Sequence, residues 1–357
     1  MTDHYEIMNQ IPLGLSFDDV LLIPQYSEIS SRSEVNLTTK LTSGVSLGIP
    51  LISSNMMDIT GTEMSTTLGK LGGLGVFPRF VSPENEAEWI MLVKQSGLCA
   101  SASVGCKEGE MERADLLVKA KVDLLFLDVA HGHLRLALDM TSKLKNHFGK
   151  EVEIVSGNVS TFEGTRDLFR AGADSVKVGI GPGSICTTRV VTGSGVPQIT
   201  AILECAKAAR HYNKSIISDG GTKNSGDIVK ALASGASAVM IGNMFAGSDE
   251  APSELVEIDD KKYKRYNAST SLAEKENHIK INGDLPKNYI KQIEGIESLV
   301  PYKGPLGAII EKLLAGIKSG FSYSGANNLE QLWKKAKFIQ VTNLGIRENG
   351  FHDVLPQ

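Results

Sequence analysis

Short apolar runs alternate with helical stretches along most of this chain, and this alternation limits the accessible folds more than any other feature. From about residue 98 each apolar run ends in Gly, Asp, Ser or Asn, and the stretches between runs carry apolar residues at three- and four-residue spacing. Continuous apolar strands that alternate with helices are typical of a parallel sheet buried on both faces. The sequence therefore predicts an α/β protein.

Seven strands can be assigned before residue 245. The strands are expected at 49–54, 73–77, 122–128, 153–158, 175–179, 215–219 and 238–242, and helices at 116–120, 136–147, 161–171, 199–211 and 226–234. The segments 171–179 and 234–242 resemble each other, which indicates a repeated βα unit. Seven or eight such units predict a closed (β/α)8 barrel, or TIM barrel, with its active site at the carboxyl ends of the strands. A doubly wound open sheet is the alternative.

The pattern changes after residue 250. Residues 257–264 are charged and hairpin-like, and residues 272–297 are polar without a clear period, which predicts a mobile flap. The barrel is expected to resume at 300–304 and to continue through a helix at 306–317. Residues 343–357 are predicted to form a C-terminal arm of a single catalytic domain spanning 1–357.

Composition excludes several classes of function. The 357 residues carry a formal charge of −4, so the basic excess needed for nucleic acid or an anionic membrane is absent. The N-terminus does not resemble a signal peptide, and no apolar stretch is long enough to span a bilayer. The four cysteines form no C-x-x-C pair or zinc-like spacing. We therefore expect a cytoplasmic protein without structural disulfides.

The glycine-rich stretch 177–189 holds the strongest chemical signal. Gly179, Gly181 and Gly183 follow a strand and precede Cys186. Glycines in such a loop permit unusual backbone angles and close approach to a ligand. A free cysteine is most often a small buried hydrophobic residue. The position of Cys186 in a loop at the catalytic end of a strand instead favours a nucleophile.

This stretch resembles the signature of the IMP dehydrogenase and GMP reductase family. The signature reads Gly-Pro-Gly-Ser-Ile-Cys-Thr-Thr-Arg and stands intact at 181–189. Further matches lie at 15–22, 217–221, 240–247 and 300–304, so the resemblance covers nearly the whole chain. It implies a purine nucleotide on the carboxyl face of the barrel, where Cys186 attacks purine C2 and forms a covalent thioimidate.

The resemblance also assigns roles to individual residues. The catalytic residues are Cys186, Thr188 and Glu294, although spacing alone would make Glu294 a solvated loop carboxylate. Substrate-binding positions are Ser184, Asp219, Gly220, Gly221, Gly242, Asn243, Tyr266, Ala268, Ser269, Thr270 and Lys291. Cofactor-binding positions are Ser31, Arg32, Arg79, Asp128, Val129, Ala130, Gly179 and Gly181. A monovalent cation, K+, would be held around Gly181, Gly183, Cys186 and Arg189.

Several features favour a reductase within this family. Between Phe77 and Leu124 there is no room for the regulatory insertion that dehydrogenases usually carry. Residues 272–295 contain no arginine, so the Arg-Tyr pair with which a dehydrogenase activates water is missing, and Asn288 precedes Tyr289. Ser269 falls where reductases place a serine beside the guanine amino group. The resemblance thus implies a homotetrameric GMP reductase that uses NADPH and produces IMP and ammonia.

Two alternatives remain open from the sequence. Residues 345–353 resemble a dehydrogenase tail, so the chain could be an IMP dehydrogenase without the regulatory domain, oxidising IMP to XMP with NAD. A nucleotide-sensing protein without turnover is the non-catalytic alternative. Retention of Cys186, Thr188 and Glu294 favours an enzyme.

Overall fold

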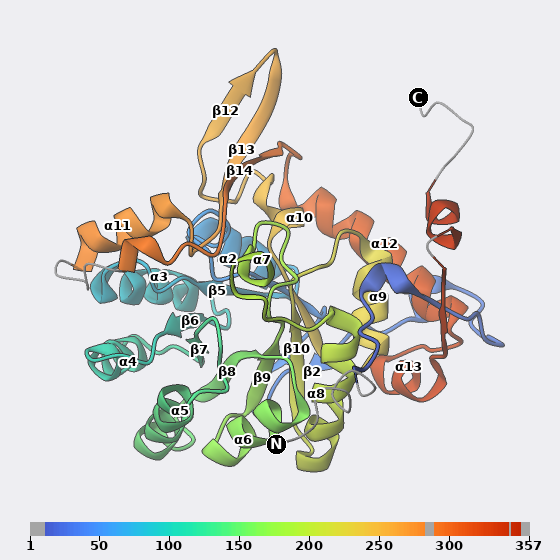
Figure 1. Ribbon diagram of the computed structural model, residues 1–357, viewed down its shortest axis with the longest axis horizontal. Helices are drawn as coiled ribbons and strands as arrows, with labels where there is room; N and C mark the ends of the chain where they lie inside the picture. Colours follow the sequence, from blue (N-terminus) through green and yellow to red (C-terminus); the bar gives the residue numbers. More distant parts are fainter. Residues whose placement is uncertain (1–10, 283–288, 343, 351–357) are drawn as a thin grey trace.

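Eight parallel strands form a closed barrel in the computed structural model, which describes residues 11–282, 289–342 and 344–350 (Figure 1). The strands are β4 (Leu51–Ser53), β5 (Leu74–Phe77), β6 (Ser101–Val104), β7 (Leu124–Asp128), β8 (Glu153–Val159), β9 (Ser175–Val178), β10 (Ser215–Asp219) and β11 (Ala238–Ile241). β11 pairs with β4 and closes the sheet. The predicted TIM barrel is confirmed, and the open sheet is excluded.

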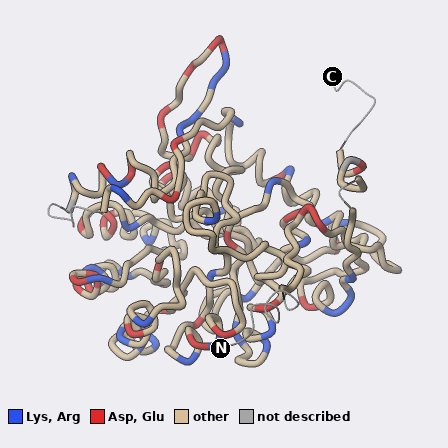
Figure 2. Tube along the Cα trace, viewed as in Figure 1, with Lys and Arg blue, Asp and Glu red and all other residues tan. Residues whose placement is uncertain are grey.

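A ring of helices covers the outside of the barrel. It consists of α2 (Thr62–Lys70), α3 (Pro83–Gln95), α4 (Glu110–Lys119), α5 (Arg135–Phe148), α6 (Phe162–Ala171), α8 (Gln198–Tyr212), α9 (Ser225–Ala233) and α12 (Leu306–Tyr323). Their inner faces pack on the sheet, while side chains such as Phe126, Ile217 and Met240 fill the barrel interior. Basic and acidic positions are interspersed on the outer helices (Figure 2), as expected for surfaces that face water.

Strand β6 was not among the seven strands expected from the sequence. Its residues are small, and Ser101 and Ser103 are fully buried although they are polar. The Ser101 hydroxyl donates to the Gly75 carbonyl, and the Ser103 amide donates to Glu86. The Ser101 hydroxyl is thus satisfied, whereas the Ser103 hydroxyl is buried without a partner among the described residues. Serines at these two positions leave the strand without the apolar run that marks the others. No insertion separates β5 from β7.

Short elements close the amino end of the barrel and tie the two ends of the described chain together. The hairpin of β2 (Thr39–Lys40) and β3 (Ser46–Leu47) places Leu41 and Leu47 against the barrel interior. Strand β1 (Val20–Leu22) pairs antiparallel with β15 (Phe338–Gln340), which follows α13 (Leu329–Lys335). The loops that follow the strands lie at the opposite end of the barrel, at the carboxyl ends of the strands.

A three-stranded antiparallel sheet projects from the carboxyl face (Figure 1). It consists of β12 (Leu255–Ile258), β13 (Lys261–Asn267) and β14 (Glu297–Pro301). The hairpin expected near 257–264 is confirmed, but the expectation that the barrel resumes at 300–304 is wrong. Because β6 completes the eight strands, β14 pairs with β13 instead. Helix α12 returns to the barrel, where it packs on α9 and α2, and α13 packs on α9 as well.

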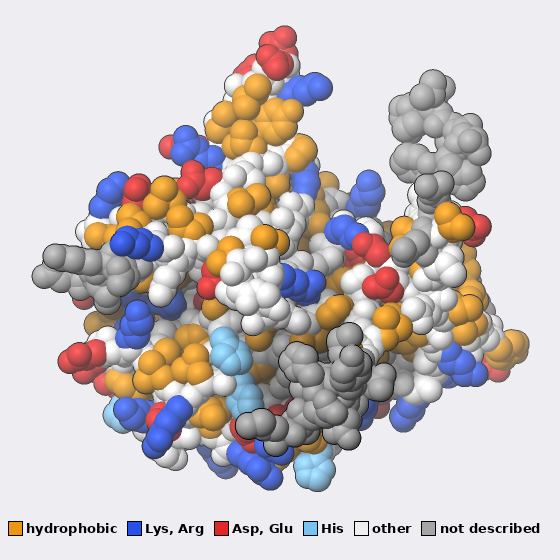
Figure 3. All heavy atoms as spheres, in the orientation of Figure 1, with side chains coloured by type: hydrophobic (Ala, Val, Ile, Leu, Met, Phe, Trp, Pro, Cys, Tyr) orange, Lys and Arg blue, Asp and Glu red, His pale blue; other side chains and the backbone are white. Residues whose placement is uncertain are grey.

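The base of this sheet is anchored by a buried lysine. Lys264 on β13 donates to the carbonyls of Ser248, Asp249 and Ala251, in the segment before β12. Leu255, which pairs with Lys264, and Ile258, near the turn, are exposed, and Figure 3 shows apolar side chains gathered on the projecting hairpin. The sheet is therefore fixed at its base and open to solvent along its length.

The region predicted as a flap contains a helix. Helix α11 (Leu272–Asn282) and the short η3 (Tyr289–Lys291) occupy its described part, and residues 283–288 lie outside the described residues. The helix gave no apolar period because two of its buried side chains are charged, Glu274 and Lys275. Lys275 donates to the carbonyls of Tyr289 and Gln292, which joins α11 to η3. Mobility of the flap stays a prediction.

The predicted C-terminal arm is only partly described. Residues 345–349 form the 3-10 helix η4 (Gly345–Asn349), while residue 343 and residues 351–357 lie outside the described residues. Among the helices of the described ranges, none is long and apolar enough to cross a membrane.

Candidate active site

A cavity of about 210 Å³ opens at the carboxyl ends of the barrel strands. Its lining includes Cys186, Asp128, Asp219, Gly179, Gly181, Gly183, Gly220, Gly242, Tyr266, Ala268, Ser269 and Thr270, all predicted site residues. A second cavity of about 450 Å³ adjoins it and shares Gly183, Gly220, Gly242 and Tyr266. The two cavities together form an elongated depression over the end of the barrel.

The cysteine loop runs from β9 to α7 (Thr188–Thr192) and depends on glycine at its start. Gly179 has φ +149°, and a Cβ there would lie 2.0 Å from the Asp219 carbonyl oxygen. Gly181 also has positive φ, +79°. L side chains disfavour both conformations. The loop can therefore pass close to β10 and bring Cys186 over the cavity.

Cys186 belongs to a chain of hydrogen bonds. Its thiol lies 3.2 Å from the Thr188 hydroxyl, and that hydroxyl donates to Glu294 Oε2 at 2.7 Å. A thiol, a hydroxyl and a carboxylate in this order can carry a proton away from sulfur and return it later. The three predicted catalytic residues are thus brought together.

The backbone holds Glu294 in place beside the loop. The Thr187 amide donates to the Glu294 carbonyl at 2.9 Å, and the Ile296 amide donates to the Ile185 carbonyl at 3.1 Å. Cys186 and Gly295 form an isolated antiparallel bridge between these segments. Glu294 is therefore part of a small ladder, rather than the solvated loop carboxylate that spacing alone suggested.

Two carboxylates and a lysine form the floor of the cavity. The Lys177 ammonium lies 3.1 Å from Asp128 and 2.6 Å from Asp219, and the Asn158 amide donates to Asp219 at 2.9 Å. Burial alone would raise the pKa of Asp128, but the positive charges of Lys177 and Arg79 hold it below its usual value. Asp128 is thereby kept as an anion that can accept hydrogen bonds.

The second cavity gathers six predicted substrate-binding residues, all of which except Gly220 the family resemblance assigns to the phosphate of the nucleotide. Ser184, Gly220, Gly221, Gly242, Asn243 and Tyr266 line it, and Asn243 begins the short helix α10 (Asn243–Ala246). Gly220 and Gly221 have φ of +90° and +86°, a backbone form suited to presenting amides to an anion. A Cβ on Gly242 would lie 2.6 Å from the Tyr266 hydroxyl. Glycine at 242 therefore lets Tyr266 close the cavity.

Tyr266 stays neutral in this setting. Burial raises the pKa of its hydroxyl to about 12, and the hydroxyl interacts with Ser184. A neutral phenol can donate to a phosphate oxygen, whereas a phenolate would repel it. The tyrosine thus suits the anion-binding role assigned to it.

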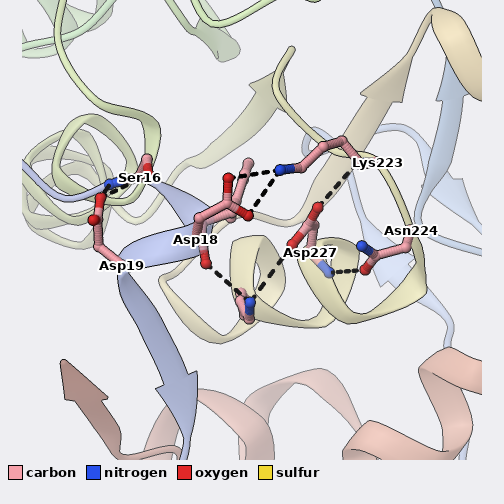
Figure 4. A network of polar contacts seen from close by, with 8 residues as sticks. Ser16, Asp18, Asp19, Lys223, Asn224 and Asp227 are labelled. Carbon is pink, nitrogen blue, oxygen red and sulfur yellow. Dashed lines mark hydrogen bonds and ion pairs between the residues drawn. The ribbon is translucent and has the colours of Figure 1, made fainter. Parts of the chain in front are cut away.

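A polar network joins the amino-terminal segment to this cavity (Figure 4). The Lys223 ammonium contacts both oxygens of Asp18 at 2.7 and 2.6 Å, and the Lys223 amide donates to Asp227 at 3.0 Å. Asp19 accepts from the amide and hydroxyl of Ser16, which caps η1 (Phe17–Asp19). The 15–22 motif therefore helps to build the wall of the second cavity.

Other predicted residues lie outside both cavities. Ser31 caps η2 (Arg32–Glu34), which packs against α12 and includes Arg32. Val129 and Ala130 directly follow β7, and Lys291 is exposed at the end of η3. Arg79 follows β5 and approaches the ring of Phe80 at 4.6 Å and Glu110 at 4.0 Å. Their assigned roles remain predictions.

The residues assigned to potassium fit a monovalent cation only in part. Gly181, Gly183 and Cys186 offer main-chain carbonyls in a tight loop, and carbonyl oxygens suit a hard cation. The Gly183 carbonyl already accepts from the Cys186 amide, and the Arg189 carbonyl accepts from the Gly193 amide. The Arg189 guanidinium, which donates to the Val196 carbonyl, adds a positive charge that does not suit a cation site. Within the described ranges, no cluster of His, Cys, Asp and Glu suits a metal ion. The potassium site stays a prediction.

Sequence reasoning missed five residues of the site. They are the amide- or amine-bearing residues Asn55, Asn158 and Lys177, which line the first cavity, and Gln198 and Lys223, which line the second. Lys177 carried a signal, because a lysine inside an apolar strand must find a partner when buried. Gln198 donates to the carbonyls of Val178 and Asp219 and so joins β9 to β10 below the loop. No pattern in the neighbouring sequence indicates this role.

Comparison with known proteins agrees with this geometry. The model of the IMP dehydrogenase / GMP reductase domain matches residues 14–352. An inosine-5'-monophosphate dehydrogenase of Cryptosporidium parvum is 40% identical over 96% of this chain and 95% of its own length. A GMP reductase of Leishmania donovani is 31% identical over 96% of this chain and 98% of its own length.

A solved structure matches the whole fold. A GMP reductase variant from Trypanosoma brucei, in complex with guanosine 5'-monophosphate, superposes with a TM-score of 0.91 at 30% identity, covering 98% of this chain and 100% of that chain. The family model and these relatives span both cavities and the cysteine loop. The chain therefore belongs to the IMP dehydrogenase/GMP reductase family and is an oxidoreductase of purine nucleotide metabolism.

Proposed function

We propose that this protein is a GMP reductase, which converts GMP to IMP and ammonia with NADPH. The observation that carries the proposal is the Cys186–Thr188–Glu294 chain of hydrogen bonds next to a flap that contains no arginine over residues 272–295. A dehydrogenase needs a base that activates water for hydrolysis. A reductase needs a group that returns one proton to departing ammonia, and this chain supplies such a group.

The proton balance of the first half-reaction matches the relay. Cys186 loses its proton through Thr188 to Glu294, and its sulfur forms a bond to C2 of guanine. Glu294 returns the proton through Thr188 to the amino group, the C2–N bond breaks and ammonia leaves. The product is a thioimidate on Cys186. A cysteine nucleophile divides one difficult substitution into two easier steps.

The second half-reaction needs a hydride at C2. Bound NADPH would supply this hydride; the C2–S bond would then break to release IMP, and the thiolate of Cys186 would take up one proton from solvent. Asp128 suits the ribose of the cofactor, because its side chain remains 23% exposed although it is paired with Lys177. Arg79, Val129, Ala130, Gly179 and Gly181 would complete this side of the site.

The nucleotide would lie along the two cavities. Its phosphate would meet Ser184, Gly221, Gly242, Asn243 and Tyr266 in the second cavity, and its ribose would donate to Asp219 beside Gly220. The base would reach the first cavity, where Ala268, Ser269 and Thr270 lie close to Cys186. Ser269 would accept from the guanine amino group, and Lys291 would approach from η3.

Assembly and the cation belong to the same proposal. Ser31 and Arg32 lie beside α12 and line neither cavity, so they would meet a cofactor in the site of a second copy within a homotetramer. Potassium, held by the carbonyls of Gly181, Gly183 and Cys186, would stabilise the cysteine loop. Arg189 would support this loop from below, since it packs against Gly181.

The alternative is an IMP dehydrogenase that oxidises IMP to XMP with NAD. It is favoured by the relatives of that name, including the one at 40% identity, and by the tail at 345–353. Product analysis separates the two enzymes. A reductase incubated with GMP and NADPH yields IMP and ammonia, one of each for every NADPH consumed. Formation of XMP from IMP and NAD, with GMP left unchanged, would reject the proposal.

A further inference from the structure

Lys177 occupies a position that none of the proposed steps uses. It lies in the middle of β9, is 3% exposed, and points its ammonium to the cavity floor. There it contacts Asp219 Oδ2 at 2.6 Å and Asp128 Oδ1 at 3.1 Å. One buried cation thus touches both carboxylates to which the two ribose-binding roles were assigned.

Strand register explains how one side chain reaches both acids. Lys177 pairs with Gly157 on β8, and Gly157 pairs with Asp128 on β7. Adjacent strands lie about 4.8 Å apart, so Asp128 is two strands away from Lys177. Gly157 carries no side chain, and a Cβ there would lie 2.7 Å from the Lys177 Cβ. Glycine at 157 therefore leaves the path across β8 open.

On its other side Lys177 lies beside β10. Ile217 pairs with Lys177, and Asp219 is two residues farther along β10, at the end of the strand. The Asn158 amide donates to the same oxygen of Asp219 and to the Gly179 carbonyl. Asp219 is thereby held from two directions, and Lys177 is the link from it to Asp128.

Charge makes this link obligatory. Asp128 and Asp219 lie on either side of Lys177 and are 23% and 19% exposed, so two partly buried negative charges are compensated by the positive charge between them. The pKa of Lys177 lies above its usual value, because the two carboxylates outweigh the effect of burial. The lysine is therefore charged at neutral pH, and its orientation fixes the position of both acids.

We propose that Lys177 is a positioning residue that couples the nucleotide half of the site to the dinucleotide half. This rests on the proposed function for the assignment of Asp219 to the nucleotide ribose and of Asp128 to the cofactor ribose. When the first ligand binds to Asp219 or Asp128, it fixes the position of the Lys177 ammonium. The ammonium in turn fixes the position of the other carboxylate. Because this ordering is needed only once, the second ligand binds more tightly.

Thermodynamic linkage gives the proposal a measurable form. If the nucleotide tightens binding of the dinucleotide by some factor, the dinucleotide must tighten binding of the nucleotide by the same factor. We expect a factor of about 5 to 20 in the wild-type protein, within the range usual for coupled sites. A lysine that served only the fold would give no such factor.

The test uses GMP with NADP+, and every protein in it carries C186A as background, so that GMP forms no thioimidate and NADP+ has no hydride to transfer. Calorimetry measures the Kd of each ligand alone and in the presence of the other, for the protein that is wild type at position 177 and for K177M. The variant should bind each ligand several-fold more weakly, and its coupling factor should fall to about 1. Unchanged coupling in K177M, or weakening of only one ligand, would overturn the proposal.

Two further variants keep the result interpretable. K177R retains the positive charge, so it should fold. The logarithm of its coupling factor should be at least half of the wild-type value. If K177M does not fold, a coupling factor of 1 in K177R overturns the proposal. K145M is the matched control, because Lys145 pairs with Asp174 at 2.7 Å away from both cavities. It should leave both Kd values and the coupling unchanged.

The reaction assay separates this inference from the proposed function. If product analysis identifies a dehydrogenase, the same titrations are made with IMP and NADH, which also cannot react. Coupling that depends on Lys177 would then stand although the reductase proposal had failed. Reductase activity without coupling would reject the role of Lys177 alone.

Discussion

The Thr188 hydroxyl donates to Glu294 Oε2 at 2.7 Å, although the two residues are separated by 106 positions in the sequence. Thr188 begins α7 directly after the cysteine loop, and Glu294 lies in the last part of the flap, between η3 and β14. Cys186 contacts the same hydroxyl. The proton pathway of the proposed reaction is therefore assembled only when these two distant segments meet.

Removal of the carboxylate of this pair should stop proton handling without preventing nucleotide binding. E294Q keeps the size of the side chain but cannot take a proton from Thr188, so kcat should fall about 100- to 1,000-fold. The Kd for GMP should change less than about threefold. Steady-state kinetics and calorimetry on the same preparation measure both quantities.

The pair should also act as one unit. T188V removes the hydroxyl that connects Cys186 to Glu294, and the double variant T188V/E294Q should lose no more activity than the worse single variant. T187V is the control, because the main-chain amide of Thr187, and not its hydroxyl, meets Glu294. Multiplication of the two single losses in the double variant would contradict the relay.

The thiol of Cys186 should be indispensable for turnover. C186A should show no reductive deamination above background while it still binds GMP, and mass spectrometry should detect no nucleotide adduct. C99A is the matched control, since burial and then the charge of Asp123 raise the pKa of the Cys99 thiol to about 12 and leave it unreactive. Equal losses in the two variants would refute a nucleophilic role.

Glycine at position 179 should be required for both stability and activity. In G179A the new methyl group meets the Asp219 carbonyl, and the backbone must leave φ +149°. We expect a loss of about 2 to 4 kcal/mol in the free energy of unfolding. Chemical denaturation measures this loss. G307A, in α12 with open space around the position, should be neutral or slightly stabilising.

Docking of α11 should depend on pH through Glu274. Burial, and then the charges of Asp58 and Glu297, raise the pKa of this carboxyl from 4.5 to about 7. The docked helix therefore holds the proton more tightly than the undocked one, so docking is strongest at low pH and weakens as pH rises from about 4.5 through about 7. At higher pH the buried charge opposes docking.

E274Q should remove this dependence, because glutamine resembles the protonated acid. At about pH 8.5 the variant should protect the α11 amides from hydrogen exchange by about 1 to 2 kcal/mol more than the wild type, and at about pH 5 the two should agree. E276Q, at an exposed position of the same helix, is the control. Wild-type protection that rises with pH, after correction for intrinsic exchange, would contradict the assignment.

The barrel could be predicted because its physics is local. Seven strands and five helices between residues 116 and 234 follow from apolar periodicity, which reports burial directly, whereas α2 and α3 were not predicted. Strand β6 was missed because Ser101 and Ser103 interrupt its apolar run, although both residues are fully buried in the barrel. Without β6 the barrel has only seven strands, and residues 300–304 are the next run that could supply the eighth. Residues 300 and 301 instead belong to β14, which pairs with β13.

Site residues that stand together in one sequence motif could be predicted. Site residues that become neighbours only through the fold could not. Cys186 and its glycines stand in one motif, and Thr188 is part of it. Spacing alone gave Glu294 no partner, since its hydrogen bond depends on the route of the flap. Lys177 escaped because its partners, Asp128 and Asp219, become neighbours only when β7 and β10 enter one closed barrel.

The most direct test follows the absorbance of reduced nicotinamide in two parallel reactions, with potassium present. One contains the protein with GMP and NADPH, and the other contains the protein with IMP and NAD. The account predicts loss of absorbance in the first, with release of one ammonia per NADPH oxidised, and no change in the second. A gain of absorbance with IMP and NAD, and none lost with GMP and NADPH, would contradict it.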